Sequence, residues 1–136
     1  MLLTDGPEGE HCVRTTTYHA FSLFKAHRSK TAVKVETTDS SPLGISVSAS
    51  KSDRELVITC VNPRFDSDMQ VECDVRGNSP REGTAQILHD ADFNAYNSFE
   101  QSDRVIPKQY SVKVEGGKVR IDLPRLSVVT ATLPIS

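Results

Sequence analysis

Apolar residues recur with a helical period in only one stretch of the chain, residues 17–27, which read Thr-Tyr-His-Ala-Phe-Ser-Leu-Phe-Lys-Ala-His. At about 3.6 residues per turn, the apolar side chains spread over roughly 200° of the helix surface. They are Tyr18, Ala20, Phe21, Leu23 and Phe24. A helix with so much apolar surface needs cover on two sides, and one sheet supplies only one. The pattern therefore predicts a helix at a junction, in a chain that is one part of a larger protein.

Polar residues mark both ends of this helix. Three threonines stand at positions 15–17, and a threonine hydroxyl can accept a hydrogen bond from a free amide of the first turn. Lys25, His27 and Arg28 lie in the last turn, where the helix dipole favours cations. We expect the N-cap among the threonines and the helix end near residue 27.

From residue 31 onward the apolar residues recur with a period of two, which is typical of β-strands. Residues 56–61 are almost continuously apolar, as in a central strand that is covered on both faces. Residues 69–76 alternate strictly between apolar and polar, which predicts one buried and one solvated face. The expected strands are residues 31–38, 45–48, 56–61, 69–75, 84–88, 110–115, 118–123 and 126–133.

Two of these strands form an expected hairpin around the glycines at 116–117. A two-residue Gly-Gly loop suits the positive φ angles that tight hairpins require. The expected cross-strand pairs are Val112–Ile121, Val114–Val119 and Glu115–Lys118. With turns at short intervals between the strands, the sequence predicts an antiparallel β-sandwich of the jelly-roll type, preceded by one α-helix.

Residues 89–107 interrupt the strand pattern, and a connection of this length is often functional. Asn94 and Asn97 are expected to bond the loop backbone. The loop also contains three of the eight aromatic residues of the chain, Phe93, Tyr96 and Phe99.

Composition indicates an ordinary globular domain. The 136 residues are 25% charged and 37% hydrophobic, with a net charge of −2, so neither nucleic acid nor an anionic membrane is an expected partner. No apolar run approaches the roughly 20 residues of a membrane span. The chain starts without a signal-peptide pattern. We expect a cytoplasmic protein, although the start of a fragment says little about location.

Three cysteines, at positions 12, 60 and 73, are too few and too irregularly spaced for a disulfide framework or a zinc site. Cys60 and Cys73 fall on apolar strand faces and are expected to be small buried hydrophobic residues. We expect no cofactor and no metal ion.

Several stretches, taken in order, resemble the C-terminal region of α-L-arabinofuranosidases of glycoside hydrolase family 51. They are Met-Leu-Leu-Thr-Asp-Gly at 1–6, the helical stretch 17–27, Asp-Phe-Asn-Ala-Tyr-Asn-Ser-Phe-Glu at 92–100, Arg-Val-Ile-Pro at 104–107, the Gly-Gly hairpin, and Leu-Ser-Val-Val at 126–129. One departure is Thr16, where that family often has proline, so the first residue of the helix is less well defined.

The resemblance implies a (β/α)₈ catalytic barrel followed by a C-terminal jelly-roll sandwich. Residues 1–28 would then be the tail of the barrel with its last helix, and residues 29–136 the sandwich. The parent enzyme would hydrolyse terminal α-L-arabinofuranosyl residues of arabinose-containing polysaccharides with retention. Its two catalytic glutamates would lie upstream, so this chain is expected to hold no catalytic residue.

The acidic residues of the long loop offer little chemistry of their own. A retaining glycosidase needs two carboxyl groups about 5 Å apart in a cleft, and nothing in their spacing predicts that. Asp90, Asp92 and Asn94 resemble the start of a calcium loop. Ala95 and Gln101 stand where that loop needs glycine and glutamate, so turn-forming Asx side chains are the preferred interpretation.

Three roles therefore stay open for the chain. In the first it docks on the barrel and stabilises it through Tyr18, Phe21, Leu23 and Phe24. In the second it binds carbohydrate through the aromatic residues of the long loop, which are otherwise expected to pin that loop to the sandwich or the barrel. In the third it mediates homo-oligomer formation through the helix.

Overall fold

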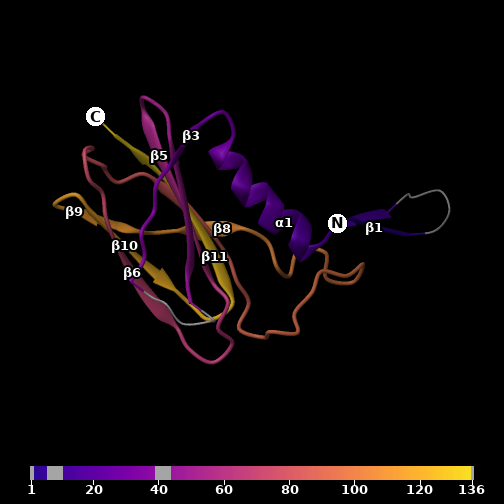
Figure 1. Ribbon diagram of the computed structural model, residues 1–136. Helices are drawn as coiled ribbons and strands as arrows, with labels where there is room; N and C mark the ends of the chain where they lie inside the picture. Colours follow the sequence, from indigo (N-terminus) through magenta and orange to yellow (C-terminus); the bar gives the residue numbers. More distant parts are fainter. Residues whose placement is uncertain (1, 6–10, 39–43, 136) are drawn as a thin grey trace.

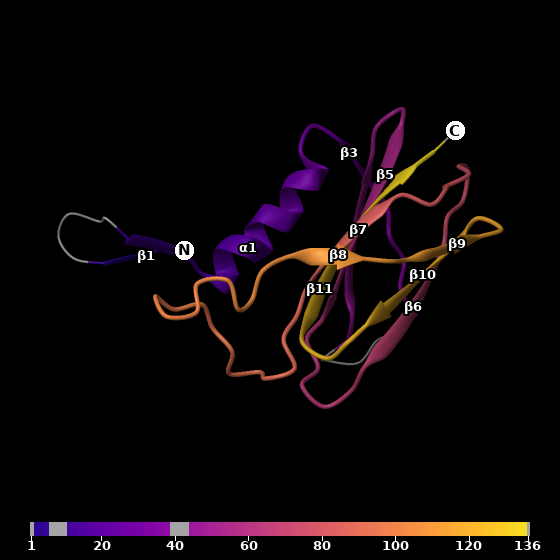
Figure 2. The same cartoon turned by 180° about the vertical axis from the view of Figure 1, so that it is seen from behind.

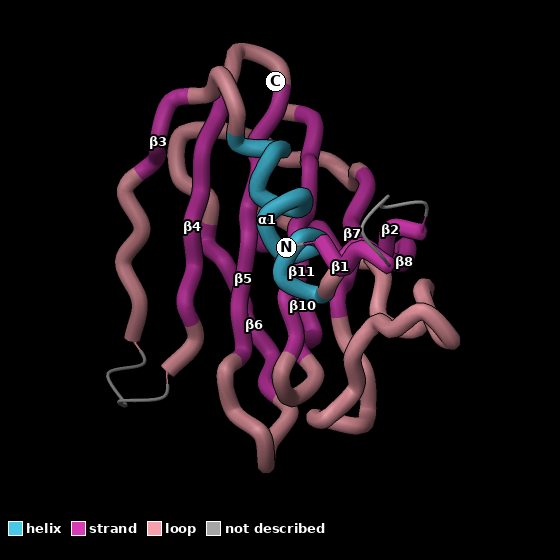
Figure 3. Tube along the Cα trace, turned by 90° about the vertical axis from the view of Figure 1, so that its right-hand side faces the viewer, coloured by secondary structure: helices cyan, strands magenta, loops and turns pink. Residues whose placement is uncertain are grey.

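The helix at the start of the chain packs across one face of a β-sandwich (Figure 1). The computed structural model describes the backbone of residues 2–5, 11–38 and 44–135, and the side chains of residues 12–38 and 44–135. The sequence Asp-Ser-Ser-Pro at 39–42 predicts a turn, and it lies outside the described residues. Figure 3 shows the layers in order: the helix, a large sheet, and a smaller sheet behind it.

Helix α1 spans Thr16–Leu23 and continues as a short 3₁₀ helix, η1, over Phe24–His27. Of the three candidate threonines, Thr15 is the N-cap: its backbone is extended, and its hydroxyl accepts a hydrogen bond from the Tyr18 amide at 3.3 Å. The helix thus begins one residue before the predicted start, and its last turn is tightened.

Two antiparallel sheets form the sandwich, which confirms the predicted fold class. The larger has the order β3-β4-β5-β11-β7-β8 and the smaller the order β6-β10-β9. A separate two-stranded ribbon, β1 and β2, precedes the helix and projects away from the sandwich (Figures 1 and 2). The strand bounds are β1 Leu2–Asp5, β2 His11–Arg14, β3 Thr31–Val33, β4 Ser46–Lys51, β5 Glu55–Asn62, β6 Met69–Asp74, β7 Thr84–Leu88, β8 Lys108–Tyr110, β9 Lys113–Glu115, β10 Lys118–Leu123 and β11 Ser127–Pro134.

The core lies between the two sheets. Strand β5 is buried along most of its length, as its apolar run predicted, and pairs with β4 on one side and β11 on the other. Strands β6 and β10 alternate between inward apolar and outward polar residues. On the outward face Glu72 accepts hydrogen bonds from Lys118 and Arg120 at 3.0 and 3.1 Å. The side chains with no exposed surface include Val57, Cys60, Val119, Ile121, Leu123, Val129 and Leu133.

Two predicted strands differ from the observed ones. The strand expected at 31–38 pairs only over β3, an edge strand with one neighbour, and Lys34 and Glu36 beyond it form an exposed ion pair. The strand expected at 110–115 divides between sheets, because β8 pairs with β7 whereas β9 pairs with β10.

The hairpin between β9 and β10 has the predicted loop. The glycines at 116 and 117 have φ angles of 58° and 78°, in the left-handed region that glycine adopts without strain. Val114 pairs with Val119 and Glu115 with Lys118, as expected. The ladder ends at Lys113, so the expected Val112–Ile121 pair lies beyond it.

Candidate functional site

The segment 89–107 forms a long loop beside the start of α1 (Figure 2). Its first turn is built by carboxylates: Asp90 Oδ1 accepts from the Asp92 amide at 2.9 Å, and Asp92 Oδ1 accepts from the Asn94 amide at 3.0 Å. These are the Asx turns that the sequence favoured over a calcium loop.

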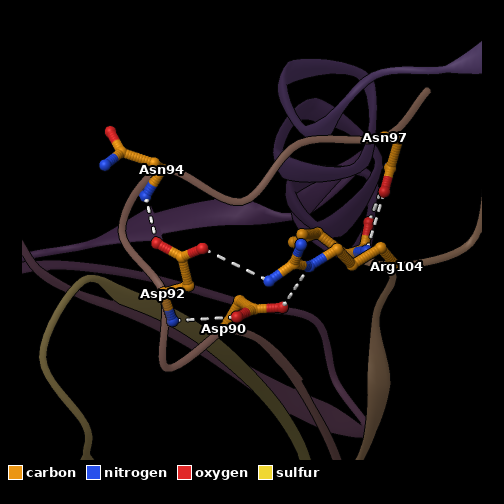
Figure 4. Close-up of polar contacts among 6 residues, drawn as sticks. Asp90, Asp92, Asn94, Asn97 and Arg104 are labelled. Carbon is orange, nitrogen blue, oxygen red and sulfur yellow. Dashed lines mark hydrogen bonds and ion pairs between the residues drawn. The ribbon is translucent and has the colours of Figure 1, made fainter. Parts of the chain in front are cut away.

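A guanidinium group lies against the remaining carboxylate oxygens of this turn (Figure 4). Arg104 donates from Nε to Asp90 at 3.4 Å and from Nη2 to Asp92 at 3.3 Å. The backbone hydrogen bond from Asp92, helped by Arg104, holds the pKa of the Asp90 carboxyl below its usual range. The turn is thus closed by a cation of the chain itself. Among the described residues, no group of three or more His, Cys, Asp or Glu is placed to hold a metal ion.

Asn97 anchors the middle of the loop and is only 2% exposed. Its amide nitrogen donates to the Arg14 carbonyl at 2.9 Å and the Val105 carbonyl at 2.8 Å, and its Oδ1 accepts from the Val105 amide at 2.7 Å. The bonds within the loop match the expectation for Asn97. The bond to Arg14, just before α1, was not predicted, because spacing in the sequence carries no sign of it.

The three loop aromatics point outward from this anchored segment. Phe93 is 72% exposed, Tyr96 68% and Phe99 48%. They do not hold the loop to the described part of the sandwich. That role falls to Asn97 and to Val105, which packs with Leu23 and Leu88. The aromatic surface is therefore available for contact with another molecule or domain.

The four helix residues that were expected to dock on the barrel divide into two groups. Leu23 is 4% exposed and packs against the sandwich, and Tyr18 is half-buried, with the Arg14 guanidinium 5.2 Å from its ring centroid. Phe21 is 64% and Phe24 40% exposed. One side of the helix is thus covered by the described chain, and the other side is left open.

His27 fastens the end of the helix to the large sheet. Its Nδ1 lies 2.6 Å from the Ser50 hydroxyl of β4 and its Nε2 2.7 Å from the Thr59 hydroxyl of β5. Thr59 in turn bonds Thr130 of β11 at 3.0 Å. Burial, and secondarily Lys30, lower the pKa of His27. From the sequence, His27 was expected near the helix end only as a cation. The polar Thr59 inside an apolar run is the one signal in the sequence for its contact with the sheet.

No helix among the described residues is long and apolar enough to cross a membrane. A shallow, open depression on the loop is lined by Gln101, Asp103 and Arg104. It has one carboxylate and one guanidinium in its lining, which is not the paired-carboxyl arrangement of a retaining glycosidase.

Comparison with known proteins gives a consistent picture. Residues 1–127 match a family model described as the α-L-arabinofuranosidase C-terminal domain. An intracellular exo-α-L-arabinofuranosidase of Bacteroides ovatus is 28% identical over 144 residues, which cover 98% of this chain and 27% of that protein.

Solved structures show the same relation. The arabinofuranosidase of glycoside hydrolase family 51 from Xanthomonas axonopodis superposes with a TM-score of 0.83 at 28% identity, over 98% of this chain and 28% of that one. The Thermotoga maritima α-L-arabinofuranosidase, solved with arabinose, shares the fold with a TM-score of 0.77 at 19% identity, over 98% of this chain and 31% of that one. The chain thus spans little more than a quarter of the length of the first two relatives.

Proposed function

Because this chain belongs to the family of α-L-arabinofuranosidase C-terminal domains, we propose that it is the non-catalytic sandwich of a longer arabinofuranosidase and that it docks on and stabilises the catalytic (β/α)₈ barrel of the same polypeptide. In this proposal residues 1–28 end the barrel and residues 29–136 form the sandwich. The parent would hydrolyse terminal α-L-arabinofuranosyl residues and act in the cytoplasm. A relative named an intracellular exo-α-L-arabinofuranosidase supports an intracellular location.

The observation that carries this proposal is the open face of α1 and η1. Phe21 and Phe24 lie outward while Leu23 on the opposite side is buried in the sandwich. Covering a phenylalanine side chain is worth about 1.5–3 kcal/mol, so two such rings on a helix at a domain junction favour a second body there. The relatives are longer than this chain, which supports the rest of the same polypeptide as that body.

Substitution of Phe21 tests the docking face. Phe21→Ala in the full-length enzyme should lower the free energy of unfolding by about 1–3 kcal/mol, because a docked ring loses its contacts. In the isolated chain, where the ring is 64% exposed, the same change should cost under about 0.5 kcal/mol. Denaturant melts of both proteins measure the difference.

Phe65→Ala is the matched control, because Phe65 is 63% exposed on the connection between β5 and β6. It should be nearly neutral in both proteins. Equal, small effects of Phe21→Ala in the two proteins would contradict docking through the helix. If instead Phe21→Ser converts a dimer of the isolated chain to a monomer in light scattering, the helix mediates homo-oligomer formation.

Carbohydrate binding is a second candidate function, favoured by the exposure of Phe93, Tyr96 and Phe99. Flat aromatic faces can cover the C–H groups of a sugar. In this structure the three rings do not hold the loop against the described part of the sandwich. Calorimetry against arabinoxylan and arabino-oligosaccharides distinguishes the two functions. Binding that disappears in Tyr96→Ala and Phe99→Ala would favour a carbohydrate-binding module, and no heat of binding would favour docking alone.

A further inference from the structure

The loop 89–107 is fastened to the beginning of α1 rather than to its end. The side chain of Asn97 donates a hydrogen bond to the Arg14 carbonyl at 2.9 Å, and the helix starts at Thr16. Figure 2 shows the same relation: the orange loop lies next to the start of the helix, where the ribbon of β1 and β2 joins it. The loop is therefore fixed to the segment that leads into α1.

The direction of a barrel helix decides which of its ends lies near the active site. In a (β/α)₈ barrel each strand runs toward the catalytic face and the helix after it runs back, so every barrel helix begins at the catalytic face. In the proposed parent, α1 is the last helix of the barrel. Its beginning, together with the loop that is tied to it through Asn97, then lies at the rim of that face.

The loop holds its aromatic rings outward on a fixed frame. Arg104 pairs with Asp90 at 3.4 Å and with Asp92 at 3.3 Å, and Val105 is buried beneath the loop. The exposed rings are those of Phe93, Tyr96 and Phe99. Because the loop around the rings is already ordered, a ligand that contacts them loses little free energy in ordering the protein.

Polar side chains follow the rings along the loop. Gln101, Asp103 and Arg104 are exposed and line a shallow, open depression. Flat rings can cover the C–H groups of a sugar, and amide and carboxylate groups can bond its hydroxyl groups. Covering the Asp103 carboxylate with another domain would cost desolvation free energy. This surface therefore fits a hydrated sugar chain better than the wall of the barrel.

We propose that the loop 89–107 is part of the substrate cleft of the parent enzyme and binds the sugars on the leaving-group side of the cleaved bond, an inference that rests on the proposed function. An enzyme that removes a terminal arabinofuranosyl residue holds that residue in its reaction centre, so all other sugars of the substrate lie on the leaving-group side. The aromatic rings stack on these sugars, and Gln101 and Asp103 bond their hydroxyl groups. A carbohydrate-binding module acts apart from the active site, whereas this loop acts together with the barrel.

Kinetics of the full-length enzyme on two substrates test this assignment. An arabino-oligosaccharide carries sugars on the leaving-group side, and methyl α-L-arabinofuranoside carries only a methyl group there. In Tyr96→Ala and in Phe99→Ala, the ratio of kcat/KM for the oligosaccharide to kcat/KM for the methyl glycoside should fall about tenfold, which corresponds to about 1.4 kcal/mol. The fall should come from KM for the oligosaccharide, because contacts with outer sugars are equally strong before and during bond cleavage.

Phe65→Ala is the matched control, because Phe65 is 63% exposed on the connection between β5 and β6. It should leave the ratio unchanged. Unchanged ratios in Tyr96→Ala and Phe99→Ala, in an enzyme that hydrolyses both substrates, would overturn this inference and leave the proposed function standing. A lower melting temperature of these two variants with an unchanged ratio would mean that the barrel covers the rings, which also overturns it. A wild type that hydrolyses neither substrate would overturn the proposed function itself.

Discussion

At the scale of single residues, His27 shows how a half-buried side chain that looks like a surface cation can link the helix to the sheet as a neutral ring. Both of its ring nitrogens bond hydroxyl groups of the large sheet, Ser50 and Thr59. A neutral imidazole has one donor and one acceptor nitrogen. A hydroxyl group can form a hydrogen bond with either of them, because it both donates and accepts. The neutral ring therefore joins η1 to β4 and β5 without a charge at this contact.

The lowered pKa of His27 makes stability depend on pH. Between its unfolded value of 6.5 and its lower folded value, the unfolded chain binds more protons than the folded chain. The stabilisation is therefore complete above about pH 6.5 and is lost as the pH falls through this window. His19 acts in the same direction, because burial and then Arg14 lower its pKa, against a smaller opposite effect of Asp103.

Replacement of His27 should reveal both contributions. His27→Ala should lower the free energy of unfolding by about 1–3 kcal/mol at pH 8, because two hydroxyl groups lose their partner. The loss should be smaller at pH 5.5, because keeping the His27 ring neutral already lowers the stability of the folded wild type at that pH. Urea melts at the two pH values measure it. Lys25→Ala, an exposed change in η1, should cost under about 0.5 kcal/mol at both, and an equal loss for His27→Ala at both pH values would contradict the assignment.

At the scale of elements, the long loop is held by a polar anchor rather than by its aromatic residues. Asn97 satisfies three backbone groups, two of them on Val105 and one on Arg14. The loop and the residues before α1 are thus tied together, although they are more than eighty positions apart.

Asn97→Ala should therefore loosen the loop. Backbone groups that are buried lose their partner, so the free energy of unfolding should fall by about 2–4 kcal/mol. Amide hydrogen exchange should rise across 93–105 before the sheets are affected. Asn94→Ala is the matched control, because its side chain is exposed, and it should change both readouts little. Unchanged exchange in Asn97→Ala would show that the anchor is not needed.

The elements also show how far the sequence could predict the fold. Residues 56–61 and 69–75 kept their predicted faces, because burial of alternate apolar residues decides which way a strand lies. The strand expected at 110–115 did not keep one partner. Tyr110 and Val114 both point to the core, so the pattern is the same on either side of the change of sheet, and only tertiary pairing reveals it.

The helix shows the same limit for the candidate site. The wide apolar surface of the helix predicted that it would be covered on two sides. Which side packs against the sandwich, however, depends on where a distant loop lies. Leu23 is buried by Leu88 and Val105, and Phe21 is not. Nothing in the stretch 17–27 alone distinguishes these two residues.

At the scale of the whole molecule, the proposed docking role makes a prediction about the parent enzyme. Deletion of residues 29–136 should lower the melting temperature or the solubility of the parent before it alters its hydrolytic activity. The deletion would uncover the helix surface that packs on the sandwich, and the barrel would lose the domain docked on it. Thermal melts and activity on a small arabinofuranoside measure the two effects separately. A truncated barrel with full stability and full activity would contradict a stabilising role.

The attachment of α1 has a mechanical consequence for such a parent. Its start is tied through the Arg14 carbonyl to the loop, and its end is tied through His27 to strands at the centre of the large sheet. A helix that is held by hydrogen bonds at both ends is restrained from tilting against the sheet. Any domain docked on Phe21 and Phe24 would therefore move together with the sandwich. The connection between the two domains would be rigid and would not act as a hinge.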